Sequence, residues 1–240
     1  MKFPKFESCG KCEDGYIINE DLNTVTKCDC LIEYQERVKL LHRFISANIP
    51  ISVVDYNIES YIGSDEESNI EKLKQFIEEF GEKFYNQTLY FYGESGTQKT
   101  TISYWIAREL IKKNFNVKFV LMNDLIKLLT NESFDDDIDT SSYNECDLLI
   151  IDRAFVKEQV TIYKSGYQIP FLDNFLRRRI DVNQKATIIV SNVHWNSIGK
   201  NFNSDIEDLI RRKVFPFNNT FLFKDHYTIK DDFDSLNLWD

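Results

Sequence analysis

The fold of this chain is decided by residues 90–101, which read Tyr90-Phe91-Tyr92-Gly93-Glu94-Ser95-Gly96-Thr97-Gln98-Lys99-Thr100-Thr101. An apolar strand runs into a glycine-bearing turn, and a lysine and two threonines then open a helix. This order is the layout of a phosphate-binding loop, in which backbone N–H groups and the positive end of the helix dipole face phosphate oxygens. We therefore expect the loop to bind the phosphates of a nucleotide.

Two side chains of the loop have defined roles in this pattern. Lys99 is expected to reach the outer phosphates, and the Thr100 hydroxyl to bind Mg²⁺. The pattern G-x-x-x-x-G-K-[ST] has glycine where this chain has Gln98, so a side chain stands where the backbone usually passes close to the ligand. Gln98 is thus the departure that counts against nucleotide binding. The expected nucleotide-binding residues are Gly93, Glu94, Ser95, Gly96, Thr97, Gln98, Lys99, Thr100 and Thr101.

The composition favours a cytosolic protein that is not a general nucleic-acid coat. The chain has 240 residues, which suits one medium domain and a small accessory one. Its net charge of −10 leaves only a local patch for contact with nucleic acid. No apolar run approaches the length of a membrane span, and the first residues lack the apolar core of a secretory signal. We expect a cytoplasmic location, with reduced thiols.

Four of the five cysteines lie in the first 30 residues, as the pairs Cys9/Cys12 and Cys28/Cys30. In a reducing compartment such pairs predict a zinc site before they predict disulfides. Four thiolates make a closed tetrahedral site, which is structural and not catalytic. The alternative is four unligated or redox-active thiols. Zinc is favoured because so short a segment could hardly build a core without such a staple.

The remaining sequence alternates between strands and helices. Two amphipathic helices are expected near the N-terminus, at 31–45 and 69–84. Apolar strands are expected at 88–92, 117–121, 148–151, 187–190 and 220–223, with helices at 99–113, 123–130, 168–181 and 204–213 between them. This alternation predicts βαβ units and a mostly parallel sheet.

Two of these strands end in polar residues that suit a nucleotide site. The strand at 148–151 leads into Asp152, which in phosphate-loop proteins helps to hold Mg²⁺. Hydrolysing relatives place glutamate next, but this chain has Arg153, which cannot act as a base. Either another carboxylate substitutes, for which Glu158 is the candidate, or hydrolysis is slow or absent. Asn192 follows another strand and could bind the γ-phosphate or orient water. The alternative for Asp152 alone is a residue at a strand end that caps the next turn. The alternative for Asn192 alone is a residue of an ordinary turn.

Two clusters of basic residues close helices, at 177–179 and 211–213. Both could simply complement the helix dipole. Alternatively, Arg211 or Arg212 reaches the nucleotide of a neighbouring subunit, as an arginine finger does.

Together these residues resemble the AAA+ ATPases of the bacterial helicase-loader group, the DnaC and DnaI type, including phage-encoded relatives. The resemblance spans most of the chain. It rests on the four-cysteine arrangement with Asp14-Gly15-Tyr16, on Ala47-Asn48-Ile49-Pro50 before the ATPase core, on the Walker A segment 93–101 except at Gln98, on the Walker B segment 148–152 except for Arg153, on Asn192 as sensor 1, and on Arg211 or Arg212 as arginine finger.

The resemblance implies an α/β fold: a three-layer AAA+ P-loop core with a parallel sheet, a small N-terminal zinc-binding module and no C-terminal lid. It divides the chain into a zinc-binding and partner-binding module with its helix at 1–45, a linker and connecting helix at 46–86, and the ATPase core at 87–240. It also implies a protein that grips a hexameric replicative helicase through its N-terminal part and responds to ATP and single-stranded DNA while the helicase is loaded. Self-association on the helicase is left open.

The implied contact with single-stranded DNA falls on the segment after Walker B, through Arg153, Lys157, Tyr163, Lys164 and Tyr167. An ordinary surface loop is the alternative for that segment. Two rivals to the loader remain: an IstB-like transposition ATPase, and a non-hydrolysing zinc-module adaptor on a degenerate AAA+ fold.

Overall fold

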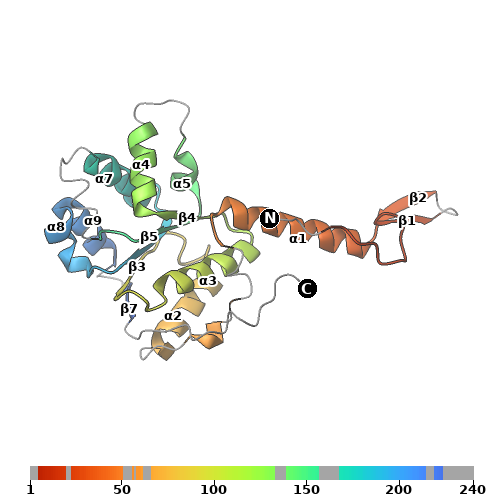
Figure 1. The fold of residues 1–240 in the computed structure, drawn as a ribbon, viewed down its shortest axis with the longest axis horizontal. Helices are drawn as coiled ribbons and strands as arrows, with labels where there is room; N and C mark the ends of the chain where they lie inside the picture. The colour runs from red at the N-terminus through yellow and green to blue at the C-terminus, as the bar shows by residue number, and fades with distance from the viewer. Residues whose placement is uncertain are drawn as a thin grey trace.

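A computed structural model describes residues 5–19, 23–50, 56, 58–61, 66–132, 139–156, 168–214 and 219–223. It consists of a layered α/β core and an N-terminal arm that projects from it (Figure 1). The arm is a two-stranded hairpin carried at the end of one long helix. Within the described ranges, no helix combines the length and apolarity needed to span a bilayer.

The core is built on a five-stranded sheet in the order β4-β5-β6-β3-β7. Its strands are β3 (Thr88–Gly93), β4 (Val117–Leu121), β5 (Leu148–Asp152), β6 (Ala186–Ser191) and β7 (Thr220–Phe223). Every adjacent pair is parallel. All residues of β5 and β6 are buried, as expected for parallel strands covered on both faces, whereas the edge strand β7 is buried only at alternate residues. The predicted parallel α/β sheet is confirmed.

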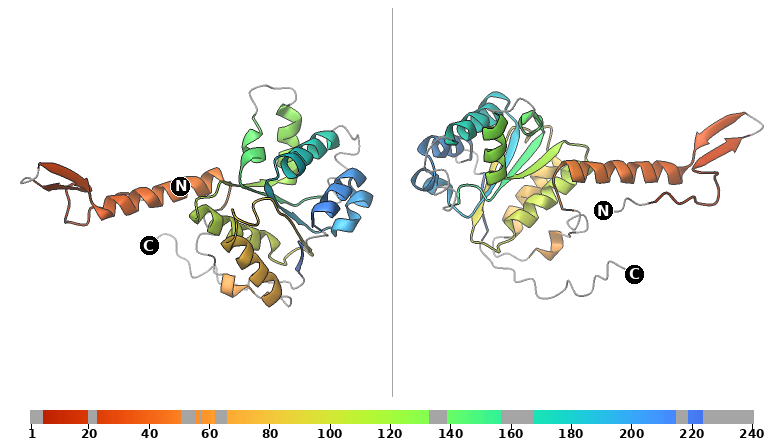
Figure 2. Two further views of the ribbon diagram at one scale, coloured as in Figure 1. Left: turned by 180° about the vertical axis from the view of Figure 1, so that it is seen from behind. Right: turned by 45° about the horizontal axis from the view of Figure 1, so that its top comes forward.

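Helices cover both faces of the sheet and make the three layers (Figure 2). One face packs against α3 (Lys99–Lys112), α2 (Glu66–Glu78) and the end of α1 (Asp29–Ser46). The other face packs against α4 (Met122–Glu132), α7 (Ile169–Arg177), α8 (Ile198–Asn201) and α9 (Ser204–Val214). Two separate apolar cores result, one on each side of the sheet.

The arm has almost no core of its own. Strands β1 (Tyr16–Asn19) and β2 (Thr24–Lys27) pair antiparallel, and every residue in them is exposed. They lead into α1, whose first turn carries Cys30 and whose last residues join the main body. There the Ala47 carbonyl accepts from the Phe119 N–H at 2.8 Å, and the Asn48 side chain donates to the Phe119 carbonyl at 3.3 Å. The base of the arm is thus hydrogen-bonded to β4.

Some element boundaries differ from the sequence-based expectation. The helix expected at 69–84 begins at Glu66 and ends at Glu78, and residues 79–86 form turns that precede β3. The helix expected at 168–181 continues from α7 into a π-helical turn, η3 (Arg178–Val182). The short helix α5 (Ser141–Glu145) was not predicted, because one and a half turns carry too little periodicity to be recognised.

The π-helical turn places Arg179 in the interior, where its side chain is fully buried. Its guanidinium donates to the carbonyls of Tyr143, Asn144, Cys146 and Ala186 and to the Thr187 hydroxyl, at 2.6–3.1 Å. Burial lowers the pKa of Arg179, and these acceptors compensate for the lost hydration. Arg179 therefore fastens the end of α5 to the start of β6, a structural role that the basic cluster 177–179 did not reveal.

Candidate nucleotide site and cysteine centre

The candidate nucleotide site lies at the edge of the sheet where the parallel strands end. Gly93 closes β3, Asp152 closes β5, and Asn192 directly follows β6. The strand register pairs Tyr92 with Ser191 and Leu121 with Asp152, so these carboxyl ends meet at one edge. In open α/β sheets that edge is where ligands bind.

Glycine is required where β3 turns into the loop. Gly93 has a φ of 143°, and a Cβ at this position would stand 2.0 Å from the Phe223 carbonyl oxygen of β7. Any side chain would therefore force β7 away from β3.

Lys99 lies inside the loop. Its ammonium donates to the Gly93 and Glu94 carbonyls and to the Thr97 hydroxyl at 2.5–2.9 Å. Burial lowers its pKa to about 8, while the carboxylates of Asp152 and Glu94 oppose the shift. At neutral pH the group still carries its charge, held where the loop wraps the start of α3. A phosphate would be met there by a fixed, weakly hydrated cation.

Thr100 and Asp152 come together directly. The Thr100 hydroxyl donates to Asp152 Oδ2 at 2.9 Å, and Asp152 Oδ1 accepts from the Arg153 N–H at 2.7 Å. Neighbouring oxygens around an octahedral Mg²⁺ at ~2.1 Å stand ~3.0 Å apart. The hydroxyl and the carboxylate therefore fit two adjacent positions of such an ion, whose charge would neutralise phosphate oxygens.

Asn192 contacts the loop itself, because its side-chain amide donates to Ser95 Oγ at 3.0 Å. The loops after β5 and β6 are tied together behind this contact. The Ser191 hydroxyl donates to the Ala154 carbonyl at 2.5 Å and accepts from the Val193 N–H at 2.9 Å. The Ala154 N–H donates to the Val190 carbonyl at 2.9 Å. These bonds fix the ends of β5 and β6 relative to each other.

Gln98 takes the backbone conformation that explains why glycine is usual here. Its φ of 62° is left-handed, which costs a residue with a side chain about 1–2 kcal/mol. The side chain is directed to the segment that follows α1, where the Tyr56 hydroxyl donates to Gln98 Oε1 at 3.3 Å. The loop thus keeps its shape with glutamine present, at the cost of backbone strain.

The residue after Asp152 also has a left-handed backbone, with φ of 52° at Arg153. Its side chain is exposed at the same edge of the sheet. Among the described residues that follow the strand, 153–156, there is no carboxylate, and a guanidinium cannot accept a proton from water. Of the residues expected to meet single-stranded DNA, only Arg153 is described; Lys157, Tyr163, Lys164 and Tyr167 lie outside the described residues.

Arg211 and Arg212 lie far from this edge in their own chain. They stand in the last turn of α9, which runs toward the amino end of β7. Arg211 pairs with Asp208 at 2.8 Å, and Arg212 stands 3.8 Å from Asp181, shortly before β6 begins. Both side chains are more than half exposed. Either could therefore act only on a nucleotide held by another subunit.

The four N-terminal cysteines form one cluster. Their sulfurs all lie within 4.8 Å of one another, and three of the separations are 3.8 Å (Cys9 to Cys12), 3.6 Å (Cys9 to Cys28) and 3.4 Å (Cys12 to Cys30). A tetrahedral zinc ion with Zn–S bonds of ~2.3 Å sets sulfurs ~3.8 Å apart. The cluster therefore fits a closed, structural zinc site.

Local structure explains how the cysteines meet. Cys28 caps α1: the N–H groups of Leu31 and Ile32 donate to its carbonyl, and its own N–H donates to the Gly15 carbonyl at 2.7 Å. Gly15 has a φ of 87°, and a Cβ there would stand 2.7 Å from Leu31 Cβ. A hydrogen bond with Ser8 lowers the pKa of Cys12 to about 6, whereas the pKa values of Cys28 and Cys30 are raised within the same cluster.

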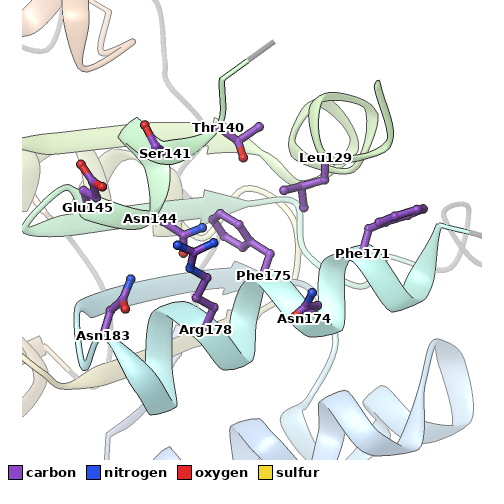
Figure 3. Close-up of a pocket in the computed structure, with 10 residues that line it drawn as sticks. All are labelled: Leu129, Thr140, Ser141, Asn144, Glu145, Phe171, Asn174, Phe175, Arg178 and Asn183. Atoms are coloured by element: carbon purple, nitrogen blue, oxygen red, sulfur yellow. The ribbon is translucent and has the colours of Figure 1, made fainter. Parts of the chain in front are cut away.

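A cavity of about 240 Å³ lies away from the nucleotide edge, between α4, α5 and α7 (Figure 3). Asn144 reaches into it from α5 and Arg178 from the start of η3. Asn144 Oδ1 is buried without a hydrogen-bond partner among the described residues. A hydrogen-bond donor in this cavity would satisfy that oxygen. Sequence reasoning missed the cavity, because its lining comes from three separate segments.

The comparisons with known proteins give a likeness of structure. No protein-family model and no curated protein matches the sequence. The crystal structure of DnaI is 16% identical with a TM-score of 0.55, over 75% of this chain and 93% of that chain. The crystal structure of the DnaC helicase loader is 17% identical with a TM-score of 0.50, over 73% and 99%.

The replication initiator DnaA, in a structure bound to AMPPCP and single-stranded DNA, is 21% identical with a TM-score of 0.51. The match covers 72% of this chain and 50% of that one, so the chain spans about half the length of this DnaA. With its five-stranded parallel sheet and the helices on both faces, the chain has an α/β fold like that of the DnaI and DnaC structures.

Proposed function

We propose that this chain is a helicase loader that binds ATP with Mg²⁺ at the carboxyl edge of its sheet and engages a replicative helicase through its N-terminal arm. The observation that carries the nucleotide part is the meeting of three separate segments. Lys99 sits in the loop, Thr100 contacts Asp152, and Asn192 contacts Ser95. If Asp152 only capped a turn and Asn192 only belonged to one, neither side chain would need to contact the loop or the helix that follows it.

Nucleotide binding is tested by calorimetry with ATP and a non-hydrolysable analogue in the presence of Mg²⁺. Lys99→Ala removes the buried cation and should weaken binding by at least about tenfold, since a charge-assisted hydrogen bond contributes about 1.5–3 kcal/mol. Lys200→Ala, which removes an exposed lysine from α8, is the control and should bind like the parent. Equal affinity in Lys99→Ala and the parent would refute the phosphate-loop assignment.

The helicase part of the proposal rests on the arm and on the fold shared with the DnaC helicase loader. Tyr16, Ile18 and Val25 are 41%, 54% and 63% exposed. Ile18 pairs with Val25 across the hairpin, and Tyr16 lies two residues along the same strand, so all three share one face. An exposed apolar face on the hairpin, next to the cysteine cluster, suits binding to a protein partner.

This face supplies a matched pair of variants for a pull-down of the host's replicative helicase. Ile18→Ser removes an apolar side chain from the face and should reduce capture. Ile17→Ser changes a side chain of similar exposure, 44%, on the opposite face, and should leave capture intact. Equal capture by the parent and by Ile18→Ser would show that the helicase does not bind this face of the hairpin.

Slow hydrolysis belongs to the same proposal. The departures Gln98 and Arg153 favour a switch that holds ATP, and a switch needs different affinities in two states and no fast turnover. A non-hydrolysing adaptor is the alternative that these departures support. Calorimetry separates the two, because an adaptor would show no heat of binding at millimolar ATP.

A further inference from the structure

Gln98 is the residue of the phosphate loop that departs from the usual pattern. Its side chain and its backbone both make hydrogen bonds. The backbone at this position is left-handed, which glycine adopts freely and glutamine does not. The Gln98 carbonyl still accepts from the Ile102 N–H at 2.9 Å, so the residue opens α3 as the pattern requires. Something must hold glutamine in this conformation.

The side chain of Gln98 meets Tyr56. The Tyr56 hydroxyl donates to Gln98 Oε1 at 3.3 Å, 42 residues away in the sequence. Tyr56 is itself held along α3, because its carbonyl accepts from Arg108 Nη1 at 2.6 Å and its ring packs against the core beneath that helix. Arg108 is nearly buried and paired with Glu109 at 2.6 Å. The hydroxyl that reaches the loop is therefore presented from a fixed point.

We infer that Tyr56 is a positioning residue of the nucleotide site: through its bond to Gln98 it holds the phosphate loop in the shape that receives phosphate. This inference rests on the proposed nucleotide-binding function. In loops with glycine at this position no such contact is required. In this chain Tyr56 and Gln98 act as a pair. Loss of the Tyr56 hydroxyl therefore weakens nucleotide binding only while residue 98 is glutamine.

A double-mutant cycle tests the pair with a fluorescent ATP analogue. Tyr56→Phe removes only the hydroxyl and should weaken binding by up to about tenfold, the range of one neutral hydrogen bond. In a Gln98→Gly background the same substitution should have no effect, because glycine needs no support. Additive effects of Tyr56→Phe and Gln98→Gly would overturn the inference.

The control is Tyr61→Phe, which removes a hydroxyl from the same segment between α1 and α2 and keeps the ring that packs on Phe223. It should bind the analogue like the parent, and an equal loss in both tyrosine variants would overturn the inference.

A second readout needs no nucleotide. Hydrogen exchange at the amides of residues 95–99 should quicken in Tyr56→Phe and not in Tyr61→Phe, because only the first releases Gln98. Unchanged exchange in Tyr56→Phe would overturn the inference even if ATP binds. Faster exchange in a protein that fails to bind ATP would support the pair while refuting the proposed function.

Discussion

At the scale of single residues, Lys99 gives the site a pH dependence. Burial lowers its pKa to about 8, and phosphate binding requires the charged form. ATP affinity should therefore hold up to about pH 8 and then fall, approaching tenfold for each pH unit. Calorimetry between pH 7 and pH 9.5 checks this, and Lys99→Arg, which stays charged, should flatten the profile.

The fall in affinity is distinguishable from unfolding. The pKa of Lys99 is below the ordinary 10.5, so the charged side chain costs stability below about pH 8. That cost disappears as the pH rises from about 8 to 10.5. In this range the folded protein has lost the proton of Lys99, whereas the unfolded chain still binds it. Lys99 therefore contributes increasing stability over the range in which binding weakens. A melting temperature that falls together with affinity would point to another group.

Two residues account for the expectation that hydrolysis is slow or absent. Gln98 strains the loop and Arg153 stands where hydrolysing relatives have a glutamate that polarises water. The double substitution Gln98→Gly and Arg153→Glu should raise phosphate release, whereas Arg153→Gln, which supplies no base, should not. Steady-state phosphate release with and without single-stranded DNA is the measurement. If phosphate release does not increase in the double variant, a residue other than Gln98 and Arg153 limits hydrolysis.

At the scale of elements, the hairpin of β1 and β2 depends on the cysteine cluster. All residues of both strands are exposed, and a two-stranded ribbon without a core is marginal in water. Removing zinc should unfold residues 1–30, abolish helicase capture and leave the thermal transition of the core unchanged. Metal analysis, circular dichroism and the pull-down together check this.

Matched cysteine variants sharpen that experiment. Cys12→Ser removes one ligand and should reproduce the effect of chelation. Cys146→Ala changes a buried thiol outside the cluster and should keep both the metal and the partner. A partner that still binds after verified metal removal would contradict the dependence of the arm on zinc.

At the scale of the whole molecule, the position of Arg211 and Arg212 predicts action between subunits. They lie at the sheet edge opposite Lys99, so one chain cannot complete its own site with them. Mixing Lys99→Ala with Arg212→Ala, or with Arg211→Ala, should restore part of the loading activity that each variant lacks. A mixed interface combines the lysine of one subunit with the arginine of the other.

Loading of the helicase onto single-stranded DNA is the readout for this mixing experiment. Arg178→Ala is the control, because Arg178 is another exposed arginine at a helix end and lines the cavity away from the nucleotide edge. It should load like the parent. If neither mixture recovers activity, the arginines of α9 serve only the ion pairs with Asp208 and Asp181.

Much of this molecule follows from its sequence because the relevant signals are local. The runs that became β5 and β6 are apolar throughout, and the turn from Gly93 to Thr101 has a glycine, a lysine and a threonine at fixed spacing. The strands, the parallel sheet and the grouping of cysteines were predictable from such neighbours in the chain. The failure at α5 and the π-helical turn has the same cause, since short or irregular segments carry weak local signals.

Only the tertiary structure decided which distant residues touch. Asn192 donates to Ser95 and Tyr56 to Gln98 across long stretches of chain, and Arg179 lies in the interior although its neighbours in the basic cluster do not. No pattern of adjacent residues encodes such contacts, because the order β4-β5-β6-β3-β7 arises from packing two helical layers on one sheet. The sequence by itself determined the elements and the chemistry they carry, and the packing determined which of them share a site.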